Sequence, residues 1–155
     1  MMTLSYFSHR FHLRLLQMSP WNQRLNDFGK KMEGILHERI ENFLGEKIIR
    51  TIGKYDKHDF FSPSYDIELK SRQPPWRTTD PRLKSGWVVP SCKFENLTEN
   101  KKTICFYYFE EENRLFYINY DKTLFSTFKK DRGPITIQEH YYIPEKFWTE
   151  ISAIE

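Results

Sequence analysis

An acid and a lysine stand two residues apart in a segment that reads as a strand. Residues 65–71 alternate polar and apolar side chains. Because side chains two apart in a strand share a face, Asp66, Glu68 and Lys70 point one way and their apolar neighbours the other. Phosphodiester hydrolysis needs carboxylates that can hold a metal ion. It also needs a neighbouring group, such as an ammonium, that can hold water or neutralise charge on a phosphate.

A further acid precedes this strand across the turn signal Ser62-Pro63-Ser64. If residues 57–61 pair antiparallel with 66–70, with position numbers summing to about 127, Asp59 lies opposite Glu68. Opposed side chains are roughly 5 Å apart at Cβ, where two carboxylates repel unless a cation joins them. Hard oxygen ligands favour Mg²⁺ or Mn²⁺. Asp56 and Asp66 compete for the role of first acid, and only the assumed register prefers Asp59.

The spacing of these residues resembles the motif of a known family. The motif consists of Asp59, eight intervening residues and then Glu68-Leu69-Lys70 in an apolar strand. It is similar to that of the PD-(D/E)XK nuclease superfamily, the restriction-endonuclease-like group that includes Holliday-junction resolvases. The resemblance covers roughly residues 28–72. It implies a nuclease core in which Asp59, Glu68 and the Leu69 carbonyl hold Mg²⁺ or Mn²⁺ and Lys70 is the catalytic lysine. Position 58 is His, where the nominal motif has Pro.

The family also places a glutamate on the helix before the hairpin, and the sequence predicts such a helix. Between residues 21 and 45 apolar residues recur at three- and four-residue steps, with Asn26 or Asp27 as N-cap and Gly45 as the stop. On a helical wheel Glu33 lies about 75° from the centre of the apolar stripe, at its border. Glu33 is therefore the acid best placed to reach the sheet.

The remaining pattern predicts mainly strands. Segment 87–89 is a short strand, 103–109 and 114–120 form a hairpin, 124–128 and 135–143 add strands, and 144–151 is a closing short helix. The aromatic residues of the hairpin are interpreted as core. The fold class is α/β (α+β): a central mixed β-sheet preceded by an amphipathic helix, in a restriction-endonuclease-like core.

Charge is unevenly distributed along the 155 residues. The net charge is +3, yet residues 47–93 hold ten bases and five acids, and residues 1–26 hold three bases and no acid. Basic segments favour an anionic partner, and DNA is the partner we expect. After the strand that carries Glu68, the basic residues between positions 72 and 93 are interleaved with Trp76 and Trp87. This segment either contacts nucleic acid or is a solvated loop whose two tryptophans pack on the core. The candidate DNA-binding residues are Arg72, Gln73, Arg77, Arg82, Lys84 and Lys93.

Composition excludes several other classes. The mean hydropathy is −0.71 and apolar runs are short, so a membrane protein is not expected. Two cysteines without metal-ligand spacing favour a reduced, intracellular protein over a secreted one. Residues 1–20 are interpreted as a basic, flexible tail and 21–155 as a single nuclease-like domain. Residues 1–17 remain open between a tail, a transit peptide and a wrongly assigned start.

The sequence thus predicts a metal-dependent nuclease that hydrolyses phosphodiester bonds in DNA. The alternative is a catalytically inactive nucleic-acid-binding or assembly module of the same fold. A third interpretation makes Asp66, Glu68 and Lys70 a ladder of salt bridges on an exposed strand edge, and a fourth is a structural protein without a nucleic-acid role. Resolvase-like relatives imply a homodimer. Endo- or exonuclease action, and DNA or RNA as substrate, stay open.

Overall fold

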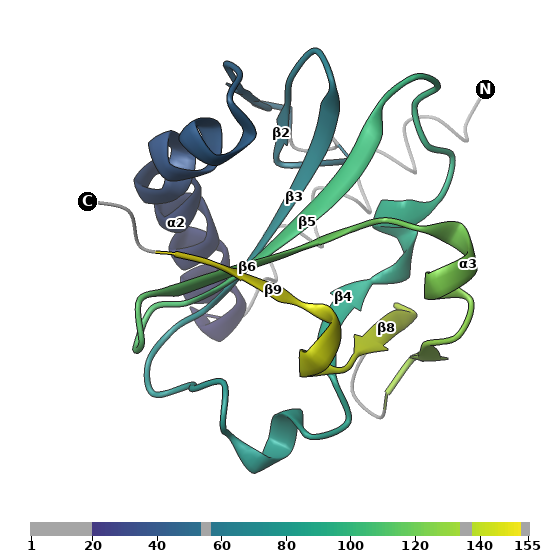
Figure 1. The fold of residues 1–155 in the computed structure, drawn as a ribbon. Coiled ribbons are helices and arrows are strands. Elements are labelled where there is room, and N and C mark those ends of the chain that lie inside the picture. The colour runs from purple at the N-terminus through teal and green to yellow at the C-terminus, as the bar shows by residue number, and fades with distance from the viewer. Residues whose placement is uncertain (1–19, 54–56, 134–137, 153–155) are drawn as a thin grey trace, which may run out of the picture.

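One long helix lies beside a mixed sheet, and a smaller sheet packs on the other side (Figure 1). The structure is a computed structural model that describes residues 20–53, 57–133 and 138–152. The helical elements are α2 (Pro20–Leu44), α3 (Lys122–Phe125) and the 3-10 turns η1 (Pro81–Leu83), η2 (Ser91–Phe94) and η3 (Glu145–Phe147). The strands are β1 (Ile49–Arg50), β2 (Phe60–Phe61), β3 (Tyr65–Arg72), β4 (Trp87–Pro90), β5 (Lys102–Phe109), β6 (Arg114–Asn119), β7 (Lys129–Asp131), β8 (His140–Ile143) and β9 (Thr149–Ile151).

The amphipathic segment forms α2, and its apolar stripe faces the larger sheet. Met32, Leu36 and Ile40, at four-residue steps, are at most 2% exposed. The predicted stop is confirmed, because Gly45 follows the helix with a φ of +73° that a residue without a Cβ adopts freely. The predicted N-cap at Asn26 or Asp27 is wrong, since both lie inside a helix that already includes Pro20.

The larger sheet has six strands in the order β1-β2-β3-β5-β6-β9, and the smaller has three in the order β4-β8-β7. Strands β3 and β5 run parallel, whereas the other neighbours in the larger sheet are antiparallel. The sheet is therefore mixed, as predicted. Between β3 and β5 the chain forms η1, β4 and η2, so the segment that follows the Glu68 strand returns across the face opposite α2.

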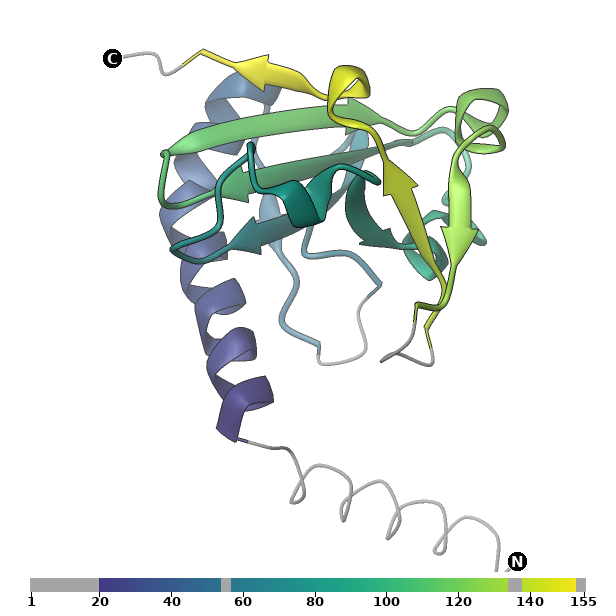
Figure 2. The same ribbon diagram turned by 90° about the horizontal axis from the view of Figure 1, so that it is seen from below.

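The helix α2 and the smaller sheet lie on opposite faces of the larger sheet (Figure 2), and an apolar layer covers each of these faces at β3 and β5. Ile67 and Leu69 pack with the buried side of α2. Cys105 and Tyr107 belong to the other layer, with the buried residues of β4 and β8. Glu68 pairs with Cys105 in the β3–β5 register, so Glu68 faces the smaller sheet. The alternation predicted for this strand is confirmed.

The aromatic residues of the β5–β6 hairpin form a core, as predicted. Trp87 of β4 is fully buried, and its ring lies 5.2 Å from Tyr107, 4.9 Å from Phe109 and 4.8 Å from Phe116, centroid to centroid. Tilted and edge-to-face contacts of this kind add to the free energy gained by burial. They fix β4, and with it the segment η2 that follows, against the larger sheet.

Two predicted elements are wrong, and the predicted hairpin is confirmed as β5–β6. The segment 124–128 begins in helix α3 rather than a strand, because the Asp121 carboxylate caps α3 by accepting from the Leu124 N–H at 2.9 Å. The segment 144–151 forms η3 and then β9 rather than a helix. Pairing of β9 with β6 gives the edge of the larger sheet backbone hydrogen bonds.

Candidate active site

The β2–β3 hairpin has the register that the sequence predicts. Position 60 pairs with 67 and 61 with 66, each summing to 127. Asp59 directly precedes β2, and its N–H donates to the Ile67 carbonyl at 3.0 Å. The Asp59 carboxylate turns toward β3, where Oδ2 accepts from the Leu69 N–H at 2.8 Å. The first acid is therefore fixed beside Glu68 by the backbone of the strand that carries Glu68.

The turn of this hairpin is held by Glu46, a residue that the sequence analysis missed. Glu46 Oε1 accepts from the Ser62 hydroxyl at 2.5 Å and from the Ser64 N–H at 3.0 Å, and Oε2 accepts from the Ser64 hydroxyl at 3.0 Å. These bonds lower the pKa of Glu46, because they favour its ionised form. Glu46 thus fastens the Ser-Pro-Ser turn to the segment after α2 and helps set the register.

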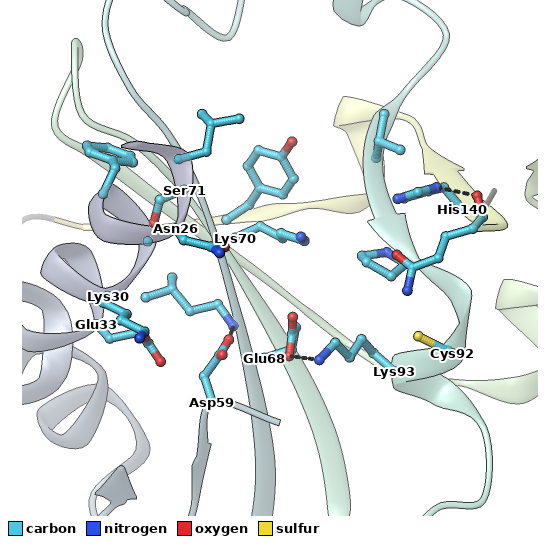
Figure 3. A pocket seen from close by; sticks show the side chains of 18 of the residues that line it. Asn26, Lys30, Glu33, Asp59, Glu68, Lys70, Ser71, Cys92, Lys93 and His140 are labelled. Carbon is cyan, nitrogen blue, oxygen red and sulfur yellow. Dashed lines mark hydrogen bonds and ion pairs between the residues drawn. The ribbon is translucent and has the colours of Figure 1, made fainter. Parts of the chain in front are cut away.

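A cleft of about 1170 Å³ opens over β3, between α2 and the smaller sheet (Figure 3). Glu33, Asp59, Glu68 and Lys70, which are the four predicted catalytic residues, all line it. The lining contains more basic side chains than the three acids Glu33, Asp59 and Glu68. An excess of positive charge in a cleft favours a polyanionic partner. The bases of the described lining are Lys30, Arg50, Lys70, Arg72, Lys93 and Arg132.

Glu68 is a buried acid of the cleft with a strongly raised pKa. The residue is 3% exposed, and Oε2 accepts no hydrogen bond. Burial, followed by repulsion from Asp59, raises its pKa to about 8. The Lys93 ammonium lies 3.7 Å from Oε2, beyond hydrogen-bond distance. Glu68 is thus a desolvated acid whose ionised form is only partly compensated within the described chain.

Glu33 reaches the same cleft from α2, at the border of the apolar stripe as the helical wheel predicts (Figure 3). Its pKa is raised to about 7, first by burial and then by the charge of Asp59. Arg50 opposes this shift, because its Nη2 lies 3.3 Å from Glu33 Oε2. The same nitrogen donates to the Lys30 carbonyl at 2.7 Å. Arg50 therefore ties β1 to α2 and holds the helix acid toward Asp59.

Lys70 and Leu69 complete the predicted motif. Lys70 is half-buried, and its side chain extends into the cleft from the same strand face as Glu68 (Figure 3). Leu69 is 8% exposed and packs in the α2 layer, while its N–H bonds to Asp59. The strand therefore anchors one residue in the core on each side of Glu68, which fixes where the acid and the lysine point.

Lys93 was predicted to bind nucleic acid with the basic loop, and the structure places it in the cleft beside the acids. Its ammonium donates to the Lys57 carbonyl at 2.5 Å. Its own carbonyl accepts from His58 Nε2 at 2.7 Å, which requires the neutral ring to carry its proton on Nε2. Burial lowers the pKa of His58. The His at the nominal Pro position thus anchors η2 to the hairpin.

The other candidate DNA-binding residues divide into two groups. Arg72 lines the cleft, and its Nε donates to the Tyr107 hydroxyl at 3.0 Å. Arg82 is held instead by Asp80, with Nη2 to Oδ2 at 2.8 Å, and its guanidinium lies 3.8 Å from the centre of the Trp76 ring. The residues that do not line the cleft are Gln73, Arg77, Arg82 and Lys84. The structure therefore separates most of the loop from the acids.

Of the two alternate acids, Asp66 does not take the place of Asp59 in the cleft. Asp66 is buried, lies 3.8 Å from the Lys101 ammonium and does not line the cleft. Asp56 lies outside the described residues. The interpretation of an exposed strand edge is wrong, because β3 lies between β2 and β5 and its two acids, Asp66 and Glu68, are buried.

Some residues of the cleft were not among the site residues predicted from the sequence. His140 and Tyr142 from β8 and Arg132 near β7 form the wall opposite α2. His140 Nδ1 lies 2.9 Å from the Gln138 carbonyl, and its pKa is lowered chiefly by burial. They meet the motif only through the packing of β8 on β4, more than 60 positions along the chain from Glu68, and no local spacing reveals such a contact.

The predicted metal site is small. In the described parts of the chain, no group of three or more His, Cys, Asp or Glu side chains is arranged to hold a metal ion. The predicted site has only two side-chain ligands, the carboxylates of Asp59 and Glu68, and its third ligand is the Leu69 backbone carbonyl. The buried Glu68 oxygen without a hydrogen bond fits a hard divalent cation, because charge on such an oxygen must be compensated.

Known proteins add no assignment. No protein-family model matches the sequence, and no curated protein or solved structure is significantly similar to it.

The described helices include none that combines the length and apolar character needed to cross a bilayer. Cys92 and Cys105 are both free thiols. The function must therefore be argued from the cleft itself.

Proposed function

We propose that the protein is a divalent-cation-dependent nuclease of the PD-(D/E)XK type that hydrolyses phosphodiester bonds in DNA. One observation carries the proposal. Glu33, Asp59, Glu68 and Lys70 come from α2, the residue before β2, and β3, and all four line one cleft rich in bases. Side chains predicted from a motif meet in space only if the hairpin register and the helix face are both as predicted.

The electrostatics of the cleft support the same function. Structural acids are normally paired or hydrogen-bonded, whereas burial and like charge raise the pKa of Glu33 to about 7 and that of Glu68 to about 8. Clustered acids with raised pKa values mark functional sites more often than structural ones. A cation between Asp59 and Glu68 would compensate this charge, and the bases around it would bind the phosphates.

Each residue then has a definite task. Asp59, Glu68 and the Leu69 carbonyl would hold Mg²⁺ or Mn²⁺, which when bound polarises the phosphate and lowers the pKa of water. Lys70, on the same strand face, positions the attacking water or neutralises charge on the phosphate. Glu33 accepts a proton from the helix side of the cleft. Arg72 binds the DNA backbone at the end of β3.

A cleavage assay tests the proposal. Purified protein is incubated with linear, circular, branched and single-stranded DNA, and with RNA, in Mg²⁺, Mn²⁺ or chelator, and products are separated on a gel. We expect cleavage that requires the cation and is lost in Glu68→Gln and Lys70→Met. Cleavage that persists in both variants would show a contaminating nuclease or a different site. The same gels distinguish endonuclease from exonuclease action.

The second candidate is a DNA-binding or assembly module that keeps the fold without chemistry. It is favoured by internal partners of the acids: Arg50 for Glu33, the Leu69 N–H for Asp59 and Lys93 for Glu68. This module binds DNA with a strong salt dependence but gains no thermal stability from Mn²⁺. An intact carboxylate site is stabilised by Mn²⁺, and the stabilisation grows with the logarithm of the ligand concentration above its Kd. Size-exclusion chromatography in the same buffers tests the proposed homodimer.

A further inference from the structure

The position of Lys93 bears on how a cation reaches Glu68. Its ammonium lies 3.7 Å from Glu68 Oε2, and the two side chains are 23% and 4% exposed. No hydrogen bond closes this pair, because Oε2 has none and the ammonium donates to the Lys57 carbonyl instead. Lys93 therefore supplies charge to Glu68 without occupying the lone pairs of its oxygen.

The backbone of Lys93 is fixed, whereas its side chain has room. The Lys93 carbonyl accepts from His58 Nε2 at 2.7 Å, and β4 before it is anchored by the fully buried Trp87. The side chain itself lines the open cleft. A rotation of this side chain that breaks the hydrogen bond from its ammonium to the Lys57 carbonyl would take the ammonium away from Glu68.

A divalent cation and this ammonium exclude one another at Glu68. Two unit charges about 4 Å apart repel strongly in a partly desolvated site, and a double charge doubles the repulsion. The Glu68 oxygen nearest the Lys93 ammonium is Oε2, which is buried and has no hydrogen-bond partner. A cation bound at this oxygen would therefore repel the Lys93 ammonium.

We propose that Lys93 is the resident counter-ion of the ionised Glu68 carboxylate, and that a divalent cation enters the site by displacing its ammonium into the cleft. This inference rests on the proposed function, because it assumes that Glu68 is a metal ligand. It changes the role of Lys93 from a general DNA contact to a residue that sets the affinity for the metal. The displaced ammonium then faces the space where a phosphate lies.

Mg²⁺ binding without DNA tests the inference. The wild type, Lys93→Met and Lys101→Met are titrated with Mg²⁺ at pH 9, where Glu68 is ionised, by calorimetry and by thermal shift. Lys101 is the matched control, because its ammonium lies 3.8 Å from Asp66 Oδ1 on the same strand. We expect the apparent Kd to fall about tenfold in Lys93→Met and to change less than about twofold in Lys101→Met.

Two further arms separate the failures. Lys93→Arg keeps the charge and should bind Mg²⁺ no more tightly than wild type; binding as tight as in Lys93→Met would overturn the inference. If wild type binds Mg²⁺ and Lys93→Met binds no more tightly, the inference fails while the proposed function stands. If no variant binds, both fail. In the wild type itself, Mg²⁺ should speed acetylation of Lys93, measured by mass spectrometry, and an unchanged rate contradicts displacement.

Discussion

Two glutamates of the β2–β3 hairpin region have pKa values shifted in opposite directions. Glu46 holds the turn between β2 and β3 through three hydrogen bonds from Ser62 and Ser64, and its pKa is lowered. Glu68 stands on β3 with one oxygen buried and without a hydrogen bond, and its pKa is raised to about 8. The chain satisfies the acid at the turn and leaves the acid in the cleft unsatisfied.

This difference separates an acid that stabilises the fold from an acid that, in the proposed function, binds a metal ion. Hydrogen bonds to a carboxylate favour its charge, so Glu46 contributes to the fold in its ionised form. A buried carboxylate without partners costs free energy, and the fold tolerates that cost where a ligand later compensates it. The comparison therefore predicts opposite results when each glutamate is changed.

The largest effect is expected for Glu68→Gln. The amide keeps the shape but cannot hold a metal ion by charge, so metal-dependent DNA cleavage should fall more than about a hundredfold. Without metal at pH 9, where Glu68 is ionised, the variant should be more stable than wild type by about 1–3 kcal/mol, because an unsatisfied buried charge is removed. Denaturant unfolding and a cleavage assay measure the two effects. A variant that is less stable without metal would show that Lys93 already compensates Glu68.

The pH dependence of stability should follow Glu68. The folded protein keeps the Glu68 proton up to about pH 8, whereas the unfolded chain loses it near the ordinary value of 4.5. Unfolding therefore releases a proton between these values, and stability falls as the pH rises, by up to about 1.4 kcal/mol per pH unit. Glu33, with a pKa of about 7, acts in the same direction.

Metal-free thermal unfolding between pH 7 and 8 measures this slope. The unfolding of Glu68→Gln is the control, and its slope should be shallower by up to one proton. Equal slopes for the two proteins would mean that Glu68 is already ionised in the fold. Saturating Mg²⁺ should also flatten the wild-type slope, because a bound cation favours the charged form.

How far the sequence predicts this site depends on which contacts are local. Asp59, Glu68 and Lys70 were predictable, since they share a hairpin whose turn and alternation are visible within a dozen residues. Glu33 was predictable because the period of a helix places it at the border of the buried face. Each of these needs only one element and its nearest neighbour.

The rest of the site depends on packing between distant segments. Lys93 reaches Glu68 because Trp87 fixes β4 in the aromatic core, and His140 enters the cleft only because β8 pairs with β4. Asp121 likewise overrode the β-propensity of the residues after it by capping α3. Basic composition pointed to the loop, but ion pairs such as Arg82 with Asp80 form only in three dimensions.

A smaller effect is expected for Glu46→Ala. Loss of the bonds to Ser62 and Ser64 should lower the Tm by a few degrees, because the turn loses its anchor. The stability that Glu46 contributes is present above its ordinary pKa and is lost as the pH falls below about 4.5. Cleavage and the Mg²⁺ response, assayed well below the Tm, should remain. If the metal response disappears as well, the turn anchor controls the position of Asp59, and the two glutamates are coupled.

The smallest effect is expected for Arg82→Ala, which extends the comparison to the bases. Arg82 is satisfied by Asp80 through Nε to Oδ1 at 3.0 Å and Nη2 to Oδ2 at 2.8 Å, whereas Arg72 lines the cleft. A base already paired gains little from a phosphate, so Arg82→Ala should change DNA affinity less than about twofold. Arg72→Ala should weaken binding and reduce the slope of log affinity against log salt by about one. Titration of labelled DNA at several salt concentrations measures both. Equal losses in the two variants would place DNA along the whole loop and remove the distinction between satisfied and available charge.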